Sequence, residues 1–331
     1  MKKIILINFF LIIFITISLE LLANFFKISN LMGIDQNLIK TNLNNHITYK
    51  KNSSGIVFNN LVYTDQYGFR VPQPNPPSSD YKYSKNQSVI FYGDSVTFGN
   101  GIDEEMTFVG LIRKKLTNLN VYNISLPGYQ ITNHIKNLAY IDNIQNINKI
   151  IYFYTLNDVD TKINLEINKE NNIVSESNKS FIETLKKNKL FKEANSFLRN
   201  KSYLYLYIKG IASDPSKRWF FQDLKMYSSE IKNFEDNLLI LKKRSDKDNI
   251  IFKVIILPYE YQTRKKECNK VNLLPQIKIK KLLVKHNINF RDLTDNFCNA
   301  KNPKSLFYKF DPMHLSKKGH KFVYNLIKDE I

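Results

Sequence analysis

Short apolar runs alternate with segments of helical periodicity along most of the chain, beginning near residue 88. Such runs, followed by small or polar residues, predict buried strands at residues 88–92, 120–125, 149–154, 250–258 and 287–293. Apolar residues at helical spacing predict helices at residues 107–116, 131–141 and 316–331. Strands that alternate with helices indicate a parallel sheet with helices on both faces.

We therefore predict an α/β fold, a three-layer α/β/α sandwich around a central parallel sheet of about five strands. In sheets of this type, ligands bind beyond the carboxyl ends of the strands, where the winding direction reverses. Candidate chemistry is therefore expected in the residues that directly follow each predicted strand.

The N-terminus carries two lysines, Lys2 and Lys3, followed by an apolar run over residues 4–22. A positive end before an apolar segment is typical of a secretory signal or a membrane anchor. The run is long for a signal peptide, and no pair of small residues marks a cleavage site before Ala23. We expect an uncleaved anchor over residues 1–23, with the bulk of the chain periplasmic or extracellular. A cleaved signal peptide and a buried core helix are the alternatives.

The segment between this apolar run and the first predicted strand is polar. Residues 24–85 are rich in Asn and Lys, and residues 71–80 are rich in proline and serine. We interpret this segment as a tether and lead-in. The sandwich is then expected over residues 86–331, with a charged, mainly helical insertion at about residues 160–247.

Composition narrows the class of protein. A chain of 331 residues that is 43% hydrophobic can bury a substantial core and is not disordered. The formal net charge of +19 comes mostly from lysine, and the seven arginines are dispersed. Basic charge without clustering is weak evidence for a nucleic-acid partner, so we expect none. Anionic lipid or an acidic polymer fits such a surface better.

The two cysteines are Cys268 and Cys298, which flank a predicted strand. In an exported protein such a pair permits one disulfide across the end of the sheet, and two buried thiols are the alternative. Two thiols without a cluster of His or Asp at ligand spacing do not form a zinc site, so no metal is expected.

Four short motifs lie at the strand ends or before the last helix: GDSVTFG at 93–99, LPGY at 126–129, TLND at 155–158 and DPMH at 311–314. A serine hydroxyl becomes a nucleophile when a base lies within hydrogen-bond reach and a third group orients that base. Ser95 is the candidate nucleophile and His314 the candidate base. Asp311 lies three residues earlier, and on a helical turn its carboxylate would reach the same imidazole.

The same motifs supply candidate donors for an oxyanion, the negatively charged oxygen of a tetrahedral intermediate. These donors are the backbone N–H groups of Ser95 and Gly128 and the side-chain amide of Asn157, and each is typically worth about 3–4 kcal/mol in a transition state. Each motif taken alone is a common turn or cap sequence. Their order and their placement at successive strand ends favour a single catalytic site.

The four motifs resemble the sequence blocks of the GDSL/SGNH hydrolases, in which Ser, Gly, Asn and His recur in this order. Ser95, Gly128, Asn157, and Asp311 with His314 fall on those positions, and the resemblance covers the chain from about residue 63 to the end. Thr155 stands where that family usually has glycine, which concerns the shape of the loop rather than the catalytic groups. The resemblance implies a flavodoxin-like sheet and a serine esterase that needs neither a metal nor an organic cofactor.

The sequence thus predicts a serine esterase that forms an acyl-enzyme at Ser95. Its expected substrates are acylated small molecules, lipids or polysaccharides of the cell envelope, such as O-acetylated carbohydrates. An O-acyltransferase with the same triad and a non-catalytic envelope-binding protein are the alternatives. Arg70 is expected to pack under the sheet, with contact to a substrate as the alternative. Asp158 is expected to order the loop around Asn157 rather than to take part in the chemistry.

Overall fold

The computed structural model describes residues 2–331 except 27–30, 32, 42–46, 77–78, 86, 160–188, 269–272 and 312. The chain divides into two compact units. One comprises residues 34–164 and 215–331 and holds the large sheet, and the other comprises residues 1–33 and 165–214.

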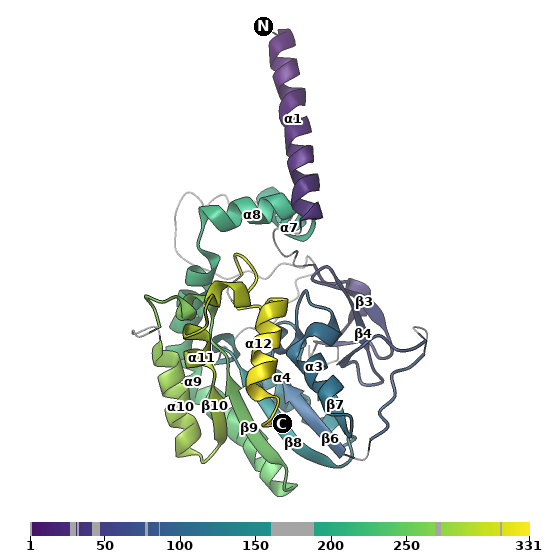
Figure 1. Ribbon diagram of the computed structural model, residues 1–331, viewed down its shortest axis with the longest axis vertical. Helices are drawn as coiled ribbons and strands as arrows, with labels where there is room; N and C mark the ends of the chain where they lie inside the picture. The colour runs from purple at the N-terminus through teal and green to yellow at the C-terminus, as the bar shows by residue number, and fades with distance from the viewer. Residues whose placement is uncertain are drawn as a thin grey trace. The chain divides into compact units, whose positions relative to one another are not determined.

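The larger unit is built around an eight-stranded sheet with the order β10-β9-β8-β6-β7-β5-β4-β3 (Figure 1). Its parallel strands are β6 (Gln87–Tyr92), β7 (Leu119–Asn123), β8 (Ile147–Tyr154), β9 (Ile251–Ile256) and β10 (Asn289–Asp292). The first parallel strand lies between the second and the third, which is the flavodoxin-like order. The predicted parallel sandwich of about five strands is therefore confirmed for this part of the sheet. The winding direction reverses at β6.

Helices cover both faces of the parallel strands (Figure 1). They are α2 (Ser95–Phe98), α3 (Phe108–Lys115), α4 (Ile131–Lys136), α5 (Leu138–Ile141), α9 (Pro215–Lys247), α10 (Leu274–Lys285), α11 (Thr294–Cys298) and α12 (Lys317–Ile327). α3 packs against α12, whereas α9 packs against α4 and α10. The chain passes from β6 to β7 through α3 and back across β6 to β8 through α4, and the right-handed rule for such crossovers places α3 and α4 on opposite faces. Single 3₁₀ turns are η1 (Gln36–Leu38), η2 (Glu104–Met106), η3 (Leu156–Val159), η4 (Glu260–Thr263) and η6 (Pro303–Leu306).

Three antiparallel strands extend the sheet beyond β7. They are β3 (Ser54–Val57), β4 (Asn60–Thr64) and β5 (Arg70–Val71), and a separate pair is formed by β1 (Ile39–Thr41) and β2 (Ile47–Tyr49). The predicted tether over residues 24–85 is therefore wrong from residue 34 onward, and the sheet-bearing unit begins well before residue 86. The physical reason is a tight hairpin: Phe58 and Asn59 have φ of 50° and 60°, the conformation of a two-residue hairpin turn, and they join two strands with buried valines.

The C-terminal part of the predicted insertion at about residues 160–247 is helical, as expected, but it belongs to the sheet-bearing unit. Residues 160–188 lie outside the described residues, and α9 belongs to the sheet-bearing unit from Pro215 onward. α9 packs there because its apolar residues fall on one face and are buried; they are Phe220, Tyr227, Phe234, Leu238 and Leu241.

The smaller unit contains α1 (Lys2–Phe25), α7 (Lys189–Lys201) and α8 (Tyr203–Ala212). By length and composition, residues 3–25 of α1 form one helix that is able to cross a membrane. Such a helix near the N-terminus fits a signal anchor or a signal peptide.

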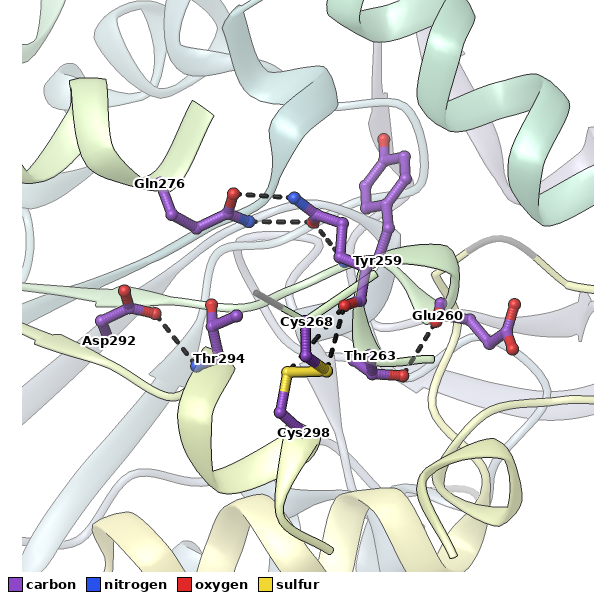
Figure 2. Close-up of a disulfide and its surroundings, with 9 residues drawn as sticks. Tyr259, Glu260, Thr263, Cys268, Gln276, Asp292, Thr294 and Cys298 are labelled. Atoms are coloured by element: carbon purple, nitrogen blue, oxygen red, sulfur yellow. Dashed lines mark hydrogen bonds between the residues drawn. A yellow bond between two sulfur atoms is a disulfide. The ribbon is translucent and has the colours of Figure 1, made fainter. Parts of the chain in front are cut away.

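A disulfide joins Cys268, after η4, to Cys298, at the end of α11 (Figure 2). The two Cα atoms lie 5.9 Å apart, and the bond closes a loop with a sequence separation of 30. It ties together the segments that follow β9 and β10, at the end of the sheet, so of the two alternatives left open by the sequence the structure has the disulfide. Closing a loop of this length stabilises the fold by about 3–4 kcal/mol in the chain-entropy description.

Candidate active site

Ser95 is the first residue of α2, directly after the carboxyl end of β6. Asp94 caps this helix by accepting a hydrogen bond of 2.8 Å from the Val96 N–H. Ser95 is 7% exposed and is therefore largely buried. The helix that it begins, α2, is short. The strand-to-helix turn thus places a serine at the edge of the sheet where a ligand is expected.

The three residues predicted to form a catalytic triad are in contact. His314 Nε2 lies 2.7 Å from Ser95 Oγ, and His314 Nδ1 lies 2.8 Å from Asp311 Oδ2. With its proton on Nδ1, the imidazole donates to the carboxylate and accepts from the serine hydroxyl. This is the tautomer that a general base needs for removing the serine proton.

Asp311, Met313 and His314 lie before α12 and outside any helix, whereas the sequence suggested a helical turn. Asp311 Oδ1 accepts hydrogen bonds from the backbone N–H groups of Met313, at 3.0 Å, and His314, at 2.8 Å. One carboxylate oxygen therefore closes the turn while the other orients the imidazole.

The environment of His314 raises the pKa of its imidazole above the ordinary value of 6.5. Burial acts to lower this pKa, but the charge of Asp311, its hydrogen bond and the charge of Asp94 outweigh that effect. The imidazolium that forms when Ser95 loses its proton is thereby stabilised.

Two contacts to His314 come from residues that the sequence did not single out. The Phe58 ring centroid lies 5.7 Å from that of His314, so the hairpin between β3 and β4 forms one wall of the site. Asn100 Nδ2 lies 3.4 Å from His314 Nε2. The positive φ values of Phe58 and Asn59 form the tight turn of this hairpin. The only signal for it in the sequence is an Asn-rich turn between apolar residues.

Gly128 lies in the loop after β7, the strand that neighbours β6. Tyr129 N–H donates to Leu126 O at 3.0 Å and Gly128 has φ of 79°, which gives a turn with Pro127 and Gly128 in its central positions. Glycine is favoured because L side chains rarely adopt this φ. Within the described residues, neither Gly128 N–H nor Ser95 N–H donates to another group, so both remain available to a ligand.

Asn157 lies in η3, directly after β8, and reaches the serine motif through Asp94. Its Nδ2 donates to Asp94 Oδ2 at 3.0 Å, which engages one amide hydrogen and leaves the second for a ligand. Thr155 Oγ1 lies 3.0 Å from the same carboxylate oxygen and 2.6 Å from Asn157 Oδ1. Thr155 and Asp94 therefore orient the Asn157 amide together.

Asp158 orders the loop around Asn157, as the sequence indicated. Its Oδ2 accepts a hydrogen bond of 2.8 Å from the Thr155 N–H. Burial, together with the charge of Asp94, raises the pKa of this carboxyl well above its ordinary value. Asp158 makes no contact with Ser95 or His314 in the structure, so its contribution is to the shape of the loop.

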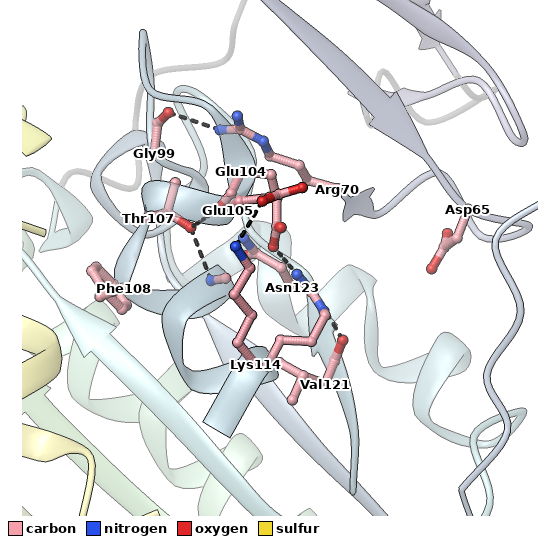
Figure 3. A network of polar contacts seen from close by, with 12 residues as sticks. Asp65, Arg70, Gly99, Glu104, Glu105, Thr107, Phe108, Lys114, Val121 and Asn123 are labelled. Carbon is pink, nitrogen blue, oxygen red and sulfur yellow. Dashed lines mark hydrogen bonds and ion pairs between the residues drawn. The ribbon is translucent and has the colours of Figure 1, made fainter. Parts of the chain in front are cut away.

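Arg70 of β5 binds the C-terminal end of α2, and Figure 3 shows its contact with Gly99. Its Nη1 donates to Phe98 O at 2.6 Å and to Gly99 O at 2.7 Å, its Nη2 donates to Ile102 O, and its guanidinium lies 4.7 Å from the Phe98 ring centroid. Burial lowers the pKa of Arg70 to about 10. The guanidinium therefore stays charged at neutral pH and satisfies carbonyls at the end of the helix that begins at Ser95. This is the structural role predicted for Arg70.

No protein-family model matches the chain, and no curated protein sequence matches it. Solved structures that align with it include the lipase/acylhydrolase from Enterococcus faecalis, at 14% identity over 74% of this chain and 95% of that chain, with a TM-score of 0.38. A catalytic mutant of an acetylxylan esterase from Geobacillus stearothermophilus aligns at 13% identity over 76% of this chain and 96% of that chain, with a TM-score of 0.42. A member of the lipolytic protein G-D-S-L family from Veillonella parvula aligns at 11% identity over 73% and 97% of the two chains, with a TM-score of 0.37. At these scores, the function proposed below depends on the geometry of this chain's own site.

Proposed function

We propose that this chain is a carboxylic ester hydrolase that works through an acyl-enzyme on Ser95. The observation that carries the proposal is the continuous hydrogen-bonded series Ser95 Oγ, His314 Nε2, His314 Nδ1 and Asp311 Oδ2, with distances of 2.7 and 2.8 Å. This series supplies a nucleophile, a base and an orienting carboxylate in one buried site.

In the proposed reaction, Ser95 Oγ forms a bond to the ester carbonyl carbon while its proton passes to His314 Nε2. The carbonyl oxygen becomes an oxyanion, which accepts hydrogen bonds from Ser95 N–H, Gly128 N–H and the second amide hydrogen of Asn157. The bond to the alcohol then breaks, and the departing oxygen takes the proton from Nε2. Water attacks the acyl-Ser95 ester by the same route, which releases the carboxylic acid and restores the serine.

We further propose that α1 anchors the enzyme in a membrane, with the sheet-bearing unit outside the cytoplasm. Lys2 and Lys3 precede the apolar helix, the arrangement that places the N-terminus on the cytoplasmic side. The disulfide between Cys268 and Cys298 supports this location, because such bonds persist in oxidising compartments. The proposed substrates are therefore O-acyl esters of envelope carbohydrates or lipids.

Hydrolysis of a short-chain aryl ester by the full chain in detergent tests the proposed reaction. Ser95→Ala is expected to lower kcat/KM by at least about 10³-fold. The matched control is Ser88→Ala at the opposite end of β6, where the hydroxyl donates to Gln145 O; it should retain activity within about twofold. Equal activity of the Ser95→Ala variant and the unmodified enzyme would exclude the mechanism. A panel of acetylated sugars and acyl lipids then identifies the preferred ester.

A further inference from the structure

The helix α7 directs an apolar face away from its neighbour. At helical spacing, its apolar residues fall on one side; they are Leu190, Phe191, Ala194, Phe197 and Leu198. On this side, Phe191 and Phe197 are 44% and 65% exposed. A helix that packed on a protein core would instead bury these side chains.

A polar residue at the border of this apolar face, Asn195, contacts α8. Asn195 Oδ1 accepts hydrogen bonds from Tyr205 Oη, at 2.7 Å, and from Lys209 Nζ, at 2.9 Å. These polar contacts join the two helices, while Phe191 and Phe197 of α7 stay exposed. This is the reverse of the arrangement expected for a helix hairpin in water.

The helix α8 adds to the same kind of surface. Ile208 and Ile211 are 56% and 64% exposed, and both lie on the side of α8 that Leu204 also occupies. Tyr203 and Gly210, on another side, are buried. The helices α7 and α8 thus each expose large apolar side chains on one face.

Glu20 of α1 fixes where α8 begins. Its carboxylate accepts hydrogen bonds from Ser202 Oγ at 2.5 Å, Tyr203 N–H at 2.8 Å and Leu204 N–H at 3.2 Å, which caps the N-terminus of α8. Glu20 precedes the end of α1 at Phe25 by five residues, or about 8 Å along the helix axis. Helices that lie in a membrane interface are buried to a depth of about 5–10 Å. The start of α8 therefore lies at interfacial depth if α1 spans the bilayer.

We infer that α7 and α8 form an interfacial platform, which lies in the surface of an anionic bilayer with its apolar side chains among the lipids. This inference rests on the proposed anchoring by α1. The charge of α7 fits such a surface, since its sequence has four basic residues and a single acidic one. Basic side chains on an amphipathic helix bind anionic headgroups, and aromatic side chains anchor it at the acyl boundary.

Lipid quenching of a fluorophore in the full chain tests the platform. Single cysteines at Phe197→Cys and Ile208→Cys are labelled with an environment-sensitive dye, and Cys268 and Cys298 do not react because they are bonded. Lys192→Cys, an exposed position on the polar side of α7, is the matched control. The protein is reconstituted in vesicles of phosphatidylcholine and phosphatidylglycerol at about 2:1, with a nitroxide near the headgroup of some lipids.

The platform predicts that the shallow nitroxide quenches the labels at 197 and 208 by about twofold more than the label at 192. Equal quenching at the three positions would overturn it. Labels at 197 and 208 that are shielded both from water and from the nitroxide would also overturn it, because that result is expected if a second copy of the chain covers this face. A label at Ile12→Cys, read with a nitroxide deep in the acyl chain, reports separately on α1. Quenching at position 12 alone therefore preserves the anchor and removes the platform, and quenching at 197 and 208 alone does the reverse.

Discussion

The two sides of the candidate site differ in how far their polar groups are already paired. On the proton-transfer side, Ser95 Oγ, both His314 nitrogens and both Asp311 oxygens have partners at 2.7–3.0 Å. On the oxyanion side, the N–H groups of Ser95 and Gly128 donate to no other group in the described part of the chain. In the proposed mechanism, the groups that move a proton are therefore assembled in advance, and the two backbone donors for a charge that exists only during the reaction are left unpaired.

Asp94 connects the two sides. Its Oδ1 caps the helix that begins at the nucleophile, and its Oδ2 accepts from Asn157 and lies beside Thr155. A single buried carboxylate thus sets the position of Ser95 and the orientation of the Asn157 amide. Changes on the proton side should therefore alter kcat and its pH dependence, whereas changes on the oxyanion side should alter kcat alone.

The largest effect is expected from Asp311→Asn, which removes the carboxylate that orients His314 on the proton-transfer side. An amide at this position favours the imidazole tautomer with the wrong nitrogen protonated, so kcat should fall by about 10³–10⁴-fold. Steady-state kinetics with an aryl ester measures this, and the exposed Asp295→Asn on α11 serves as the control. A loss of less than about tenfold would show that Asp311 does not set the tautomer.

Asn157→Ala is expected to have the next largest effect, because it removes one oxyanion donor. The expected loss in kcat is about 10²–10³-fold, with KM little changed, since the donor acts on a charge absent from the bound substrate. Asn237→Ala on the exposed side of α9 is the control. If KM rose while kcat were unchanged, Asn157 would be a ground-state binding residue instead.

Thr155→Gly introduces the glycine that is usual in the hydrolases whose motifs this sequence resembles. It tests how the Asn157 amide on the oxyanion side is oriented. The Thr155 hydroxyl positions Asn157 but does not reach the reacting atoms, so kcat should fall by only about threefold to tenfold. The pH profile should not move. A loss as large as that of Asn157→Ala would mean that the hydroxyl orients the amide more strongly than Asp94 does.

The smallest change is a shift in the pH profile, which reports on the proton-transfer side. The base must be neutral to accept the serine proton, and the pKa of His314 is raised, so the acid limb of kcat/KM should have its midpoint above 6.5. Asp311→Asn removes the charge that raises this pKa and should move the limb of the residual activity to lower pH. A limb at the same pH in both enzymes would contradict the assignment.

The same shift affects stability. Because the folded-state pKa of His314 is above its unfolded value, the pairing of its protonated form with Asp311 contributes stability below pH 6.5, and this contribution is lost as pH rises through the folded pKa. Asp311→Asn should therefore destabilise the fold more in mild acid than in mild alkali, which denaturant unfolding at the two pH values measures.

The parallel strands and the groups at their ends could be predicted from the sequence, because buried strands are continuous apolar runs and their carboxyl ends share one edge. Ser95 lies at that edge for this reason, whereas Asp311 and His314 reach it from the segment before α12. The hairpin of β3 and β4 was missed because its strands are short and carry exposed residues such as Ile56 and Leu61. Phe58 was missed with it, since its contact with His314 joins positions far apart in the sequence.

The loop before α12 was misread for a different reason. Spacing of three residues between Asp311 and His314 fits a helical turn, but the Asp311 carboxylate accepts the backbone N–H groups of Met313 and His314 and closes a turn of another kind. Local side-chain hydrogen bonds of this type compete with helix formation, and the sequence does not reveal which one forms. Both arrangements bring the carboxylate to the imidazole, so the predicted contact is present.

The central claim is that Ser95 is the activated nucleophile of this site, and covalent labelling tests it most directly. The full chain is treated with a fluorophosphonate, and the labelled residue is located by mass spectrometry of its peptides. We expect one phosphonyl group for each chain on Ser95, no label in Ser95→Ala, and labelling slowed by at least about 10²-fold in His314→Ala. A folded chain that takes up no label, or takes it up at another residue, would contradict the claim.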